Sequence, residues 1–349
     1  MKSVFSEQDI INQLRTVMDP ELNRDLVSLE MIKNVHVDED SSVSFTIELT
    51  TPACPLRNQI ENDARQAVMK LKGIKKVEIK MSARVPQNQQ LKEKVEITAK
   101  NIIAVSSGKG GVGKSTIAVN LAISLANSGA KVGIMDADIY GPNVPTMMGV
   151  NQMPKPKNGK LIPAESHNVK IMSIGFLVKD GQPLIWRGPL LHSTIRQFLT
   201  DVDWGELDYL VIDLPPGTGD VQLSLSQHIP VTCGVIVTMP QKVSLEDASR
   251  GIEMFKKLDI PIAGLVENMG AMKMPDGSTL DIFGEGGGEK MALAYGLPFL
   301  GRIPLDPEIR INGDSGFPIV VKSPDSKVAM QFSSIACEVA SFVSQINLK

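Results

Sequence analysis

The sequence predicts an α/β fold for most of the chain, with a mainly parallel sheet flanked by helices, preceded by a small α+β domain. Beyond residue 99, apolar strand-like runs alternate with helical segments, the pattern of a mainly parallel sheet. Before that point the elements are shorter, and the polar stretch 83–98 between the two parts has no clear apolar period. We therefore expect a first domain at 1–82, a flexible linker at 83–98 and a second domain at 99–349.

Composition places the chain among ordinary globular proteins. Of its 349 residues, 42% are hydrophobic and 21% are charged, and this length predicts two domains. The net charge of −3 gives no overall attraction to nucleic acid, so we expect no nucleic-acid partner. No apolar run approaches the roughly 18 residues of a transmembrane helix, and the N-terminus lacks the features of a secretory signal. Three cysteines are too few for a disulfide framework, so we expect a cytoplasmic protein without a membrane partner.

The first domain has the elements of a small α+β unit. Apolar periodicity predicts a short helix over 10–17, strands at 35–37, 43–49 and 77–81, and a second helix over 56–71. The acidic stretch 38–41 between the first two strands is typical of a hairpin turn.

One turn of this domain is chemically distinctive. Cys54 lies in Thr-Thr-Pro-Ala-Cys-Pro (50–55), where a strand ends and a helix begins. A helix N-terminus lowers the pKa of a thiol and favours the thiolate, which predicts a reactive Cys54. The alternative is a small residue that fills a turn, and the residues alone leave both open.

The second domain is organised around a glycine-rich turn between a predicted strand at 101–105 and a predicted helix that ends near Asn127. The turn reads Gly108-Lys109-Gly110-Gly111-Val112-Gly113-Lys114-Ser115-Thr116. A strand, such a turn and a helix in this order indicate a P-loop. Its backbone N–H groups and the helix N-terminus would bind the phosphates of a nucleoside triphosphate. Lys114 would reach the β- and γ-phosphates, and the Ser115 hydroxyl would ligate Mg²⁺. A glycine-rich turn without a ligand is the alternative.

Acidic residues follow two further predicted strands. Asp136 and Asp138 follow one apolar run, and Asp213 follows another. Ligands bind at the carboxyl ends of the strands in such sheets, so we expect these turns to converge on the P-loop. Asp213 has the position of a Walker B carboxylate and would hold Mg²⁺ through water, with Asp136 assisting. Asp138 would orient or deprotonate the attacking water, and Gly217 would offer its N–H to the γ-phosphate. For each carboxylate, capping a strand end or a turn is the alternative.

Lys109, directly after the first glycine, is not explained by an ordinary P-loop. It resembles the additional lysine in the deviant Walker A motif of the MinD/ParA group of ATPases. The resemblance implies a homodimer that binds ATP and hydrolyses it, in which Lys109 reaches the nucleotide of the partner subunit. A solvated loop lysine is the alternative.

Longer motifs make the chain resemble the Mrp/ApbC family, the iron–sulfur cluster carrier ATPases. These motifs are 136–145, 186–189, 197–199, 204–220, 266–269 and 303–307. The segment Asp-Pro-Glu (19–21) and the turn around Cys54 resemble an iron–sulfur assembly domain, which makes Cys54 a candidate iron–sulfur ligand. The resemblance also implies that Asn268 hydrogen-bonds the adenine edge and that residues 304–307 lie near the base. A structural role at a strand end is the alternative for Asn268.

The chain departs from this family at one place. Many members carry Cys-x-x-Cys shortly after the Glu-Asn-Met motif, where two subunits share a cluster. Here Met274 and Gly277 stand roughly at those positions, and a thioether cannot replace two thiolates. Cys337 falls on a predicted helix and Cys233 opens an apolar strand, so we expect both to be packed in the core. The usual cluster site is missing.

The resemblance therefore implies a dimeric carrier or scaffold that uses ATP and Mg²⁺ and assembles iron–sulfur clusters or transfers them to apoprotein clients, alongside other iron–sulfur assembly factors. The missing cysteines favour an alternative, a nucleotide-switched scaffold that recruits proteins and binds no cluster. A positioning ATPase of the ParA/MinD kind is a further alternative.

Two features near the C-terminus complete the prediction. The glycine-rich stretch 283–288 precedes a helix and is either a second phosphate loop or a mobile linker at the dimer face. Apolar residues spaced over 328–346 predict an amphipathic helix. Its other face is rich in Gln and Ser rather than basic, which favours docking onto the domain over membrane targeting.

Overall fold

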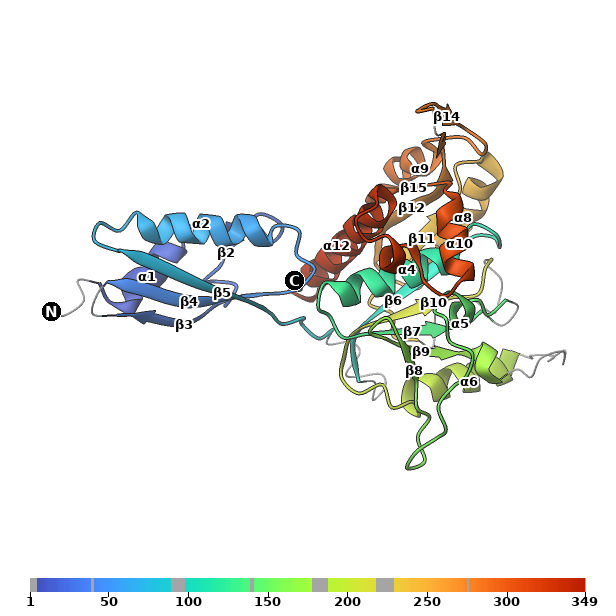
Figure 1. Ribbon diagram of the computed structural model, residues 1–349, viewed down its shortest axis with the longest axis horizontal. Helices are drawn as coiled ribbons and strands as arrows, with labels where there is room; N and C mark the ends of the chain where they lie inside the picture. Colours follow the sequence, from blue (N-terminus) through green and yellow to red (C-terminus); the bar gives the residue numbers. More distant parts are fainter. Residues whose placement is uncertain are drawn as a thin grey trace. The chain divides into compact units, whose positions relative to one another are not determined.

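The computed structural model describes residues 5–38, 41–88, 98–138, 141–177, 188–217, 229–274 and 276–348 (Figure 1). Its contacts divide the chain into two compact units, Met1–Pro86 together with Ala340–Lys349, and Gln87–Val339. The domain boundaries inferred from the sequence, including the end of the second domain at 349, stay a prediction. Of the predicted linker at 83–98, residues 89–97 lie outside the described residues.

The first unit combines a three-stranded sheet with two helices. Its elements are α1 (Glu7–Leu14), β1 (Met18–Asp19), β2 (Arg24–Asp25), β3 (Ile32–Val37), β4 (Ser42–Leu49), α2 (Arg57–Met69) and β5 (Lys76–Ala83). β3 pairs antiparallel with β4, as the predicted hairpin requires, and β4 pairs parallel with β5. This confirms the small α+β fold. The short ladder between β1 and β2 was not predicted, because strands of two residues show no periodicity.

Alternating burial explains why β4 forms the middle of this sheet. Val43, Phe45, Ile47 and Leu49 are buried, whereas the residues between them are partly exposed, so one face of the strand packs inward. Residues of α1 and α2 complete the same core. The predicted elements therefore meet through their apolar faces.

The second unit is built on an eight-stranded sheet with the order β15-β12-β11-β6-β10-β7-β9-β8. Its strands are β6 (Ala99–Ser107), β7 (Val132–Asp136), β8 (Ala164–Ser166), β9 (Val169–Ser173), β10 (Leu207–Asp213), β11 (Cys233–Thr238), β12 (Ile262–Gly270) and β15 (Phe299–Pro304). All neighbouring pairs are parallel except β8 with β9 at one edge. The mainly parallel sheet is confirmed.

Helices flank this sheet. They are α4 (Lys114–Asn127), α5 (Val144–Met147), α6 (Gly188–Thr200), α8 (Lys242–Lys257), α9 (Gly287–Tyr295), α10 (Pro307–Asp314), α11 (Ile319–Lys322) and α12 (Lys327–Asn347), with a 3₁₀ turn at Ile174–Leu177. α4 contacts β6, β7 and β10 in the middle of the sheet. Residues of α6, α8 and α9 share one hydrophobic core with the strands. Burial of these apolar faces holds the layers together.

The register of the central strands decides where the functional turns meet. Asp213, the last residue of β10, pairs with Val105 of β6 on one side and with Asp136 of β7 on the other. The P-loop follows β6, so the P-loop and the turns after Asp136 and Asp213 all leave the sheet at the carboxyl ends of neighbouring strands. This is the convergence that a parallel sheet predicts.

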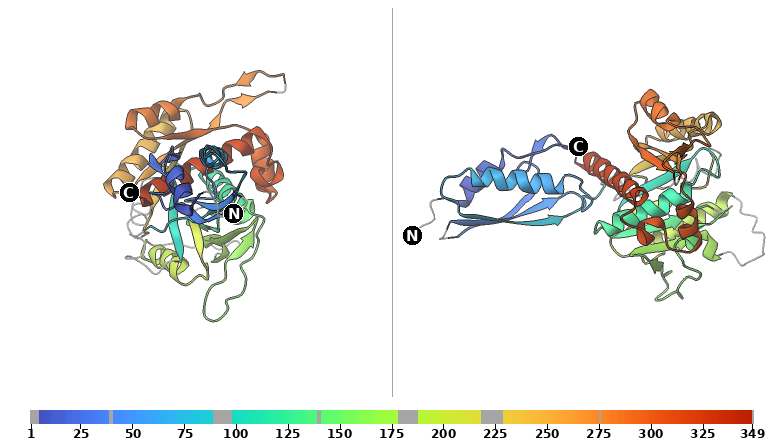
Figure 2. Two further views of the ribbon diagram at one scale, coloured as in Figure 1. Left: turned by 90° about the vertical axis from the view of Figure 1, so that its left-hand side faces the viewer. Right: turned by 45° about the horizontal axis from the view of Figure 1, so that its top comes forward.

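Two outlying elements belong to the last third of the chain. β13 (Met272–Lys273) and β14 (Thr279–Leu280) form an antiparallel hairpin that extends from the second unit (Figure 2). α12 coincides with the predicted amphipathic helix, and its residues Val328, Phe332 and Ile335 are buried. Among the described helices, none is long and apolar enough to cross a membrane.

Candidate functional site

The glycine-rich turn lies at the carboxyl end of β6 and leads directly into α4. Gly113 caps the helix with a left-handed backbone, φ 82°, a conformation that favours glycine. Lys114 and Ser115 are the first residues of α4 and are both buried. The backbone N–H groups of the first helical turn have no partner within the helix, which suits them to bind phosphate.

Lys114 and Ser115 both contact Asp213, the residue predicted to be the Walker B carboxylate. Lys114 Nζ lies 2.6 Å from Asp213 Oδ1 and 3.6 Å from Asp138 Oδ2. The Ser115 hydroxyl donates to Asp213 Oδ2 at 2.5 Å. Residues from three segments of the sequence thus form one buried polar cluster.

Asp136, like Asp213, is fully buried in this cluster. Its Oδ2 accepts hydrogen bonds from the Ser173 hydroxyl at 3.0 Å and the Val144 N–H at 3.3 Å, and its Oδ1 accepts one from the Asp138 N–H at 3.1 Å. Burial, reinforced by the nearby Asp213 carboxylate, raises the pKa of Asp136 to about 8. The carboxylates therefore repel one another in this site.

The donor chemistry of the cluster fits Mg²⁺. Lys114 is the cation that contacts Asp138 and Asp213, so the three acids carry an excess of negative charge. Hydroxyl and carboxylate oxygens are hard donors, and Mg²⁺ binds proteins through one or two carboxylates while keeping several waters. Within the described residues, no group of three or more His, Cys, Asp or Glu is arranged as a metal cage.

A pocket of about 220 Å³ lies beside the first turns of α4. Its lining residues come from α4, α5, the end of β12, the segment after β15 and the region of α10. They include Thr116, Asn268 and Pro304–Asp306. Asn268 also donates from its side-chain amide to the Val112 carbonyl at 2.8 Å, so it braces the P-loop. The structure thus brings Asn268 and Pro304–Asp306 together in the lining of one pocket, next to the glycine-rich turn.

Gly217 and Lys109, two further predicted site residues, both form hydrogen bonds with Ser107. The Gly217 N–H donates to the Ser107 carbonyl at 3.0 Å, at the base of the P-loop. Residues 218–220 of the same motif lie outside the described residues. Lys109 is partly exposed, and its carbonyl accepts a hydrogen bond from the Ser107 hydroxyl at 2.9 Å.

The sequence also singled out the cysteines and the residues that stand in place of the expected cysteine pair. Cys54 follows β4, is partly buried and packs against the core of the first unit. Cys233 is buried at the start of β11, as predicted, and burial raises its pKa to about 12. Cys337 is only partly buried, contrary to the prediction, because it lies at the border between the buried and exposed faces of α12. Met274 and Gly277 lie in the tight turn of the β13–β14 hairpin, where the Gly277 N–H donates to the Met274 carbonyl at 3.0 Å.

Some contributing residues were not anticipated from the sequence. Ser173 ends β9 and bonds Asp136, a role that its place at a strand end could have suggested. Glu267 is fully buried and paired with Arg302. A glutamate inside a long apolar strand is the signal that could have identified it, since charged residues are rarely buried unpaired.

Comparisons with known proteins identify the family of the chain. Residues 98–340 match a family model described as NUBPL iron-transfer P-loop NTPase, and residues 7–81 match one described as iron-sulfur cluster assembly protein. The chain is 50% identical over 347 residues to a protein of Synechocystis named iron-sulfur cluster carrier protein, covering 97% of this chain and 98% of the relative.

Solved structures show the same fold. A nucleotide-binding protein from Archaeoglobus fulgidus in complex with ADP has a TM-score of 0.59 and 36% identity, over 69% of this chain and 95% of that one. The cell division ATPase MinD of Pyrococcus furiosus has a TM-score of 0.53 and 26% identity, over 68% and 98%. The resemblance inferred from the motifs is thus confirmed: the chain belongs to the NUBPL-type iron-transfer P-loop NTPases and carries an iron–sulfur cluster assembly domain ahead of the NTPase domain.

Proposed function

We propose that this chain is an ATP-binding and ATP-hydrolysing carrier or scaffold that assembles iron–sulfur clusters or transfers them to apoproteins. The observation that supports it best is the buried cluster in which Lys114 and Ser115 of the P-loop both contact Asp213. The names of relatives support the cargo, since similar proteins of Synechocystis and Deinococcus radiodurans are called iron–sulfur cluster carrier proteins.

In this proposal the P-loop residues bind the triphosphate. The backbone N–H groups from Gly108 to Thr116 surround the phosphates, and Lys114 exchanges its carboxylate partners for phosphate oxygens. Asn268 and Pro304–Asp306 hold the adenine in the adjacent pocket. Binding then depends on the phosphates and on the base.

Asp138 is the proposed residue that orients or deprotonates the attacking water. It lies 3.6 Å from Lys114 Nζ, close to where the terminal phosphate would be held. Ser115 and Asp213 would hold Mg²⁺, with Asp136 assisting, and this ion would neutralise charge on the phosphates. Gly217 would turn its N–H from Ser107 to the γ-phosphate.

Lys109 completes the site only in a homodimer in this proposal, by reaching the nucleotide of the partner subunit. ATP would then favour one arrangement of the dimer, and hydrolysis would favour the other. Partners would be apoprotein clients and other iron–sulfur assembly factors.

Cys54 is the proposed cluster ligand, because Met274 and Gly277 replace the expected pair and Cys54 lies within the residues that match an iron–sulfur cluster assembly protein. Anaerobic reconstitution with iron and sulfide tests this for the wild type and for Cys54→Ser. We expect stoichiometric iron and sulfide in the wild type and a loss in the variant. Equal, substoichiometric iron in both would contradict the role of Cys54.

The turn of the β13–β14 hairpin favours a second candidate, a nucleotide-switched scaffold that binds no cluster. Cluster ligands are normally thiolates, and this turn presents a thioether and a glycine. Transfer distinguishes the candidates: a carrier reconstituted with a cluster activates an apoprotein acceptor, whereas a scaffold binds partners in response to ATP and delivers no iron.

A further inference from the structure

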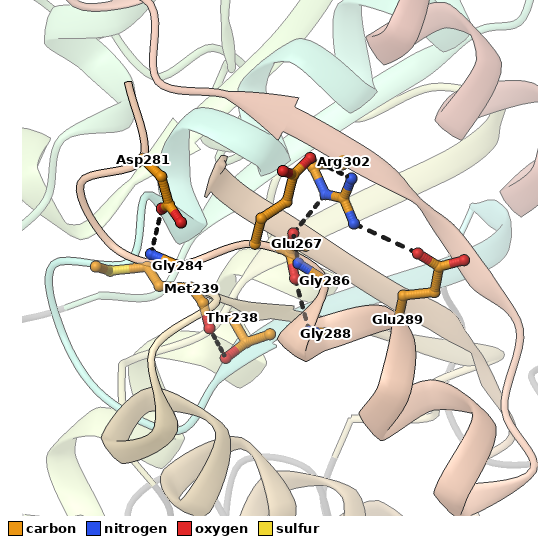
Figure 3. Close-up of polar contacts among 10 residues, drawn as sticks. Thr238, Met239, Glu267, Asp281, Gly284, Gly286, Gly288, Glu289 and Arg302 are labelled. Carbon is orange, nitrogen blue, oxygen red and sulfur yellow. Dashed lines mark hydrogen bonds and ion pairs between the residues drawn. The ribbon is translucent and has the colours of Figure 1, made fainter. Parts of the chain in front are cut away.

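The end of β12 contacts two glycine-rich segments that lie far apart in the sequence. Asn268 donates to the Val112 carbonyl of the P-loop at 2.8 Å. Its neighbour Glu267 contacts the stretch 283–288 instead (Figure 3). Two consecutive residues of one strand thus link the P-loop to the second glycine-rich stretch.

Glu267 is fully buried, and both of its carboxylate oxygens have hydrogen bonds. Oε1 accepts from the Gly286 N–H at 3.1 Å and from Arg302 Nε at 2.5 Å, and Oε2 accepts from the Gly288 N–H at 2.6 Å (Figure 3). Arg302 also pairs with Glu285 and Glu289, which are more than half exposed. Charge-assisted bonds of this kind fix both the carboxylate and the loop.

The sequence left the stretch 283–288 as either a second phosphate loop or a mobile linker, and these contacts bear on both interpretations. The N–H groups of Gly286 and Gly288 that a phosphate would need are bonded to the carboxylate of Glu267. The loop therefore binds an anion that belongs to the chain itself. It is tied down at this end, which also argues against a mobile linker.

The anchored loop supports α8, and α8 supports the P-loop. A Cβ at Gly287 would overlap the Pro240 carbonyl and lie 2.7 Å from Leu245 Cδ1, so this close contact requires glycine. Asp247 and Ala248 follow Leu245 on α8, and their backbone packs tightly on Gly108. A Cβ at Gly108 would overlap this backbone. A continuous path of close contacts thus runs from Glu267 to the first glycine of the P-loop.

We propose that Glu267 is a positioning residue for the nucleotide site. Through Asn268 it sets the end of the P-loop that faces the base pocket, and through the 283–288 loop and α8 it sets the opposite end at Gly108. The inference rests on the proposed nucleotide function of the P-loop. Glu267 touches neither phosphate nor base in this arrangement and acts through its neighbours.

The test compares Glu267→Gln with Glu289→Gln in the full chain. Both changes remove one carboxylate partner of Arg302, but Glu289 is exposed and its change leaves the loop anchored. We expect Glu267→Gln to raise the Kd for ATP at least about fivefold, the lower range of site-to-site coupling, with little change in Glu289→Gln. The Kd for tripolyphosphate, which lacks the base, should rise less than the Kd for ATP.

A general loss of stability would raise the Kd for ATP and the Kd for tripolyphosphate by the same factor. A ratio of these two Kd values that is the same in the variant and the wild type therefore overturns the proposal. So does an unchanged Kd for ATP, or an equal effect in Glu289→Gln. If Glu267→Gln does not fold, Arg302→Lys keeps the positive charge, loses the Nε donor and should shift the ratio in the same direction.

Hydrogen exchange without added nucleotide separates this proposal from the proposed function. In Glu267→Gln we expect faster exchange in peptides covering 284–290 and also in those covering 108–117. Faster exchange only in the peptides covering 284–290 would show that Glu267 stabilises the 283–288 loop and not the P-loop, and would overturn the proposal. If the wild type fails to bind ATP, the proposed function fails, while the exchange data still decide whether Glu267 supports the P-loop.

Discussion

Lys114 is buried between two carboxylates, 2.6 Å from Asp213 and 3.6 Å from Asp138, and this position fixes the ammonium where phosphates would meet it. We expect Lys114→Ala to lower kcat/KM for ATP by about 100-fold or more, which corresponds to about 2.7 kcal/mol. Calorimetric titration with ATP and a phosphate-release assay measure this. Lys131→Ala is the control, since Lys131 forms an exposed ion pair with Glu206 and should leave both measurements unchanged.

Asp138 should separate binding from hydrolysis. It contacts Lys114 more weakly than Asp213 does, so its removal leaves the main partner of the lysine in place. We expect Asp138→Ala to bind ATP with nearly wild-type affinity and to hydrolyse it on the order of 10² times more slowly, the usual effect of losing a general base. Single-turnover assays at saturating ATP measure the rate. Wild-type turnover in this variant would show that another group activates the water.

The raised pKa of Asp136 predicts how the free energy of unfolding depends on pH. Its pKa is raised to about 8 in the folded chain, above its ordinary value of 3.8. Between these values the folded state keeps a proton that the unfolded state has lost, so the free energy of unfolding falls as pH rises, by up to about 1.4 kcal/mol per pH unit. Urea unfolding from pH 5 to pH 8 without Mg²⁺ should show this slope in the wild type. Asp136→Asn should flatten it, and parallel slopes would contradict the assignment.

At the scale of elements, periodicity and chain order were enough to predict the architecture. The apolar run of β10 and the register of parallel strands place Asp213 beside Asp136 and next to the P-loop. The β13–β14 hairpin around Met274 and Gly277 was not predicted, because its strands have only two residues each and show no periodicity. Local patterns determine which residues end the strands, and a parallel sheet brings those strand ends to the same side.

Partners of individual side chains could not be predicted in this way. The bond from Lys114 to Asp213 joins residues 99 positions apart, and the bond from Arg302 to Glu267 spans 35. The pairing of Glu267 with Arg302 follows a register shift between Leu265 and Val266 of β12, which no local pattern reveals. The resemblance identified Asn268, but its hydrogen bond to Val112 could not be predicted, because it depends on how the P-loop lies against the end of β12.

At the scale of the whole molecule, the proposed homodimer makes each site depend on both subunits. Asp138 belongs to the subunit that binds the nucleotide, close to its own Lys114, whereas Lys109 would act on the nucleotide of the partner. Lys109→Ala and Asp138→Ala should each hydrolyse ATP far more slowly than the wild type when assayed alone. In a mixed dimer, however, the subunit with Lys109→Ala keeps its own Asp138 and receives an intact Lys109.

Mixing the two variants should therefore restore hydrolysis. With random pairing, half of the dimers are mixed and each has one complete site, so we expect about a quarter of wild-type activity in a two-fold symmetric dimer. Activity is measured by phosphate release across a range of mixing ratios and should peak near equal amounts. A mixture of Lys114→Ala with Asp138→Ala is the matched control, because both changes disable the nucleotide-binding subunit itself and no combination completes a site. Activity that stays at the level of the separate variants would mean that Lys109 serves its own subunit.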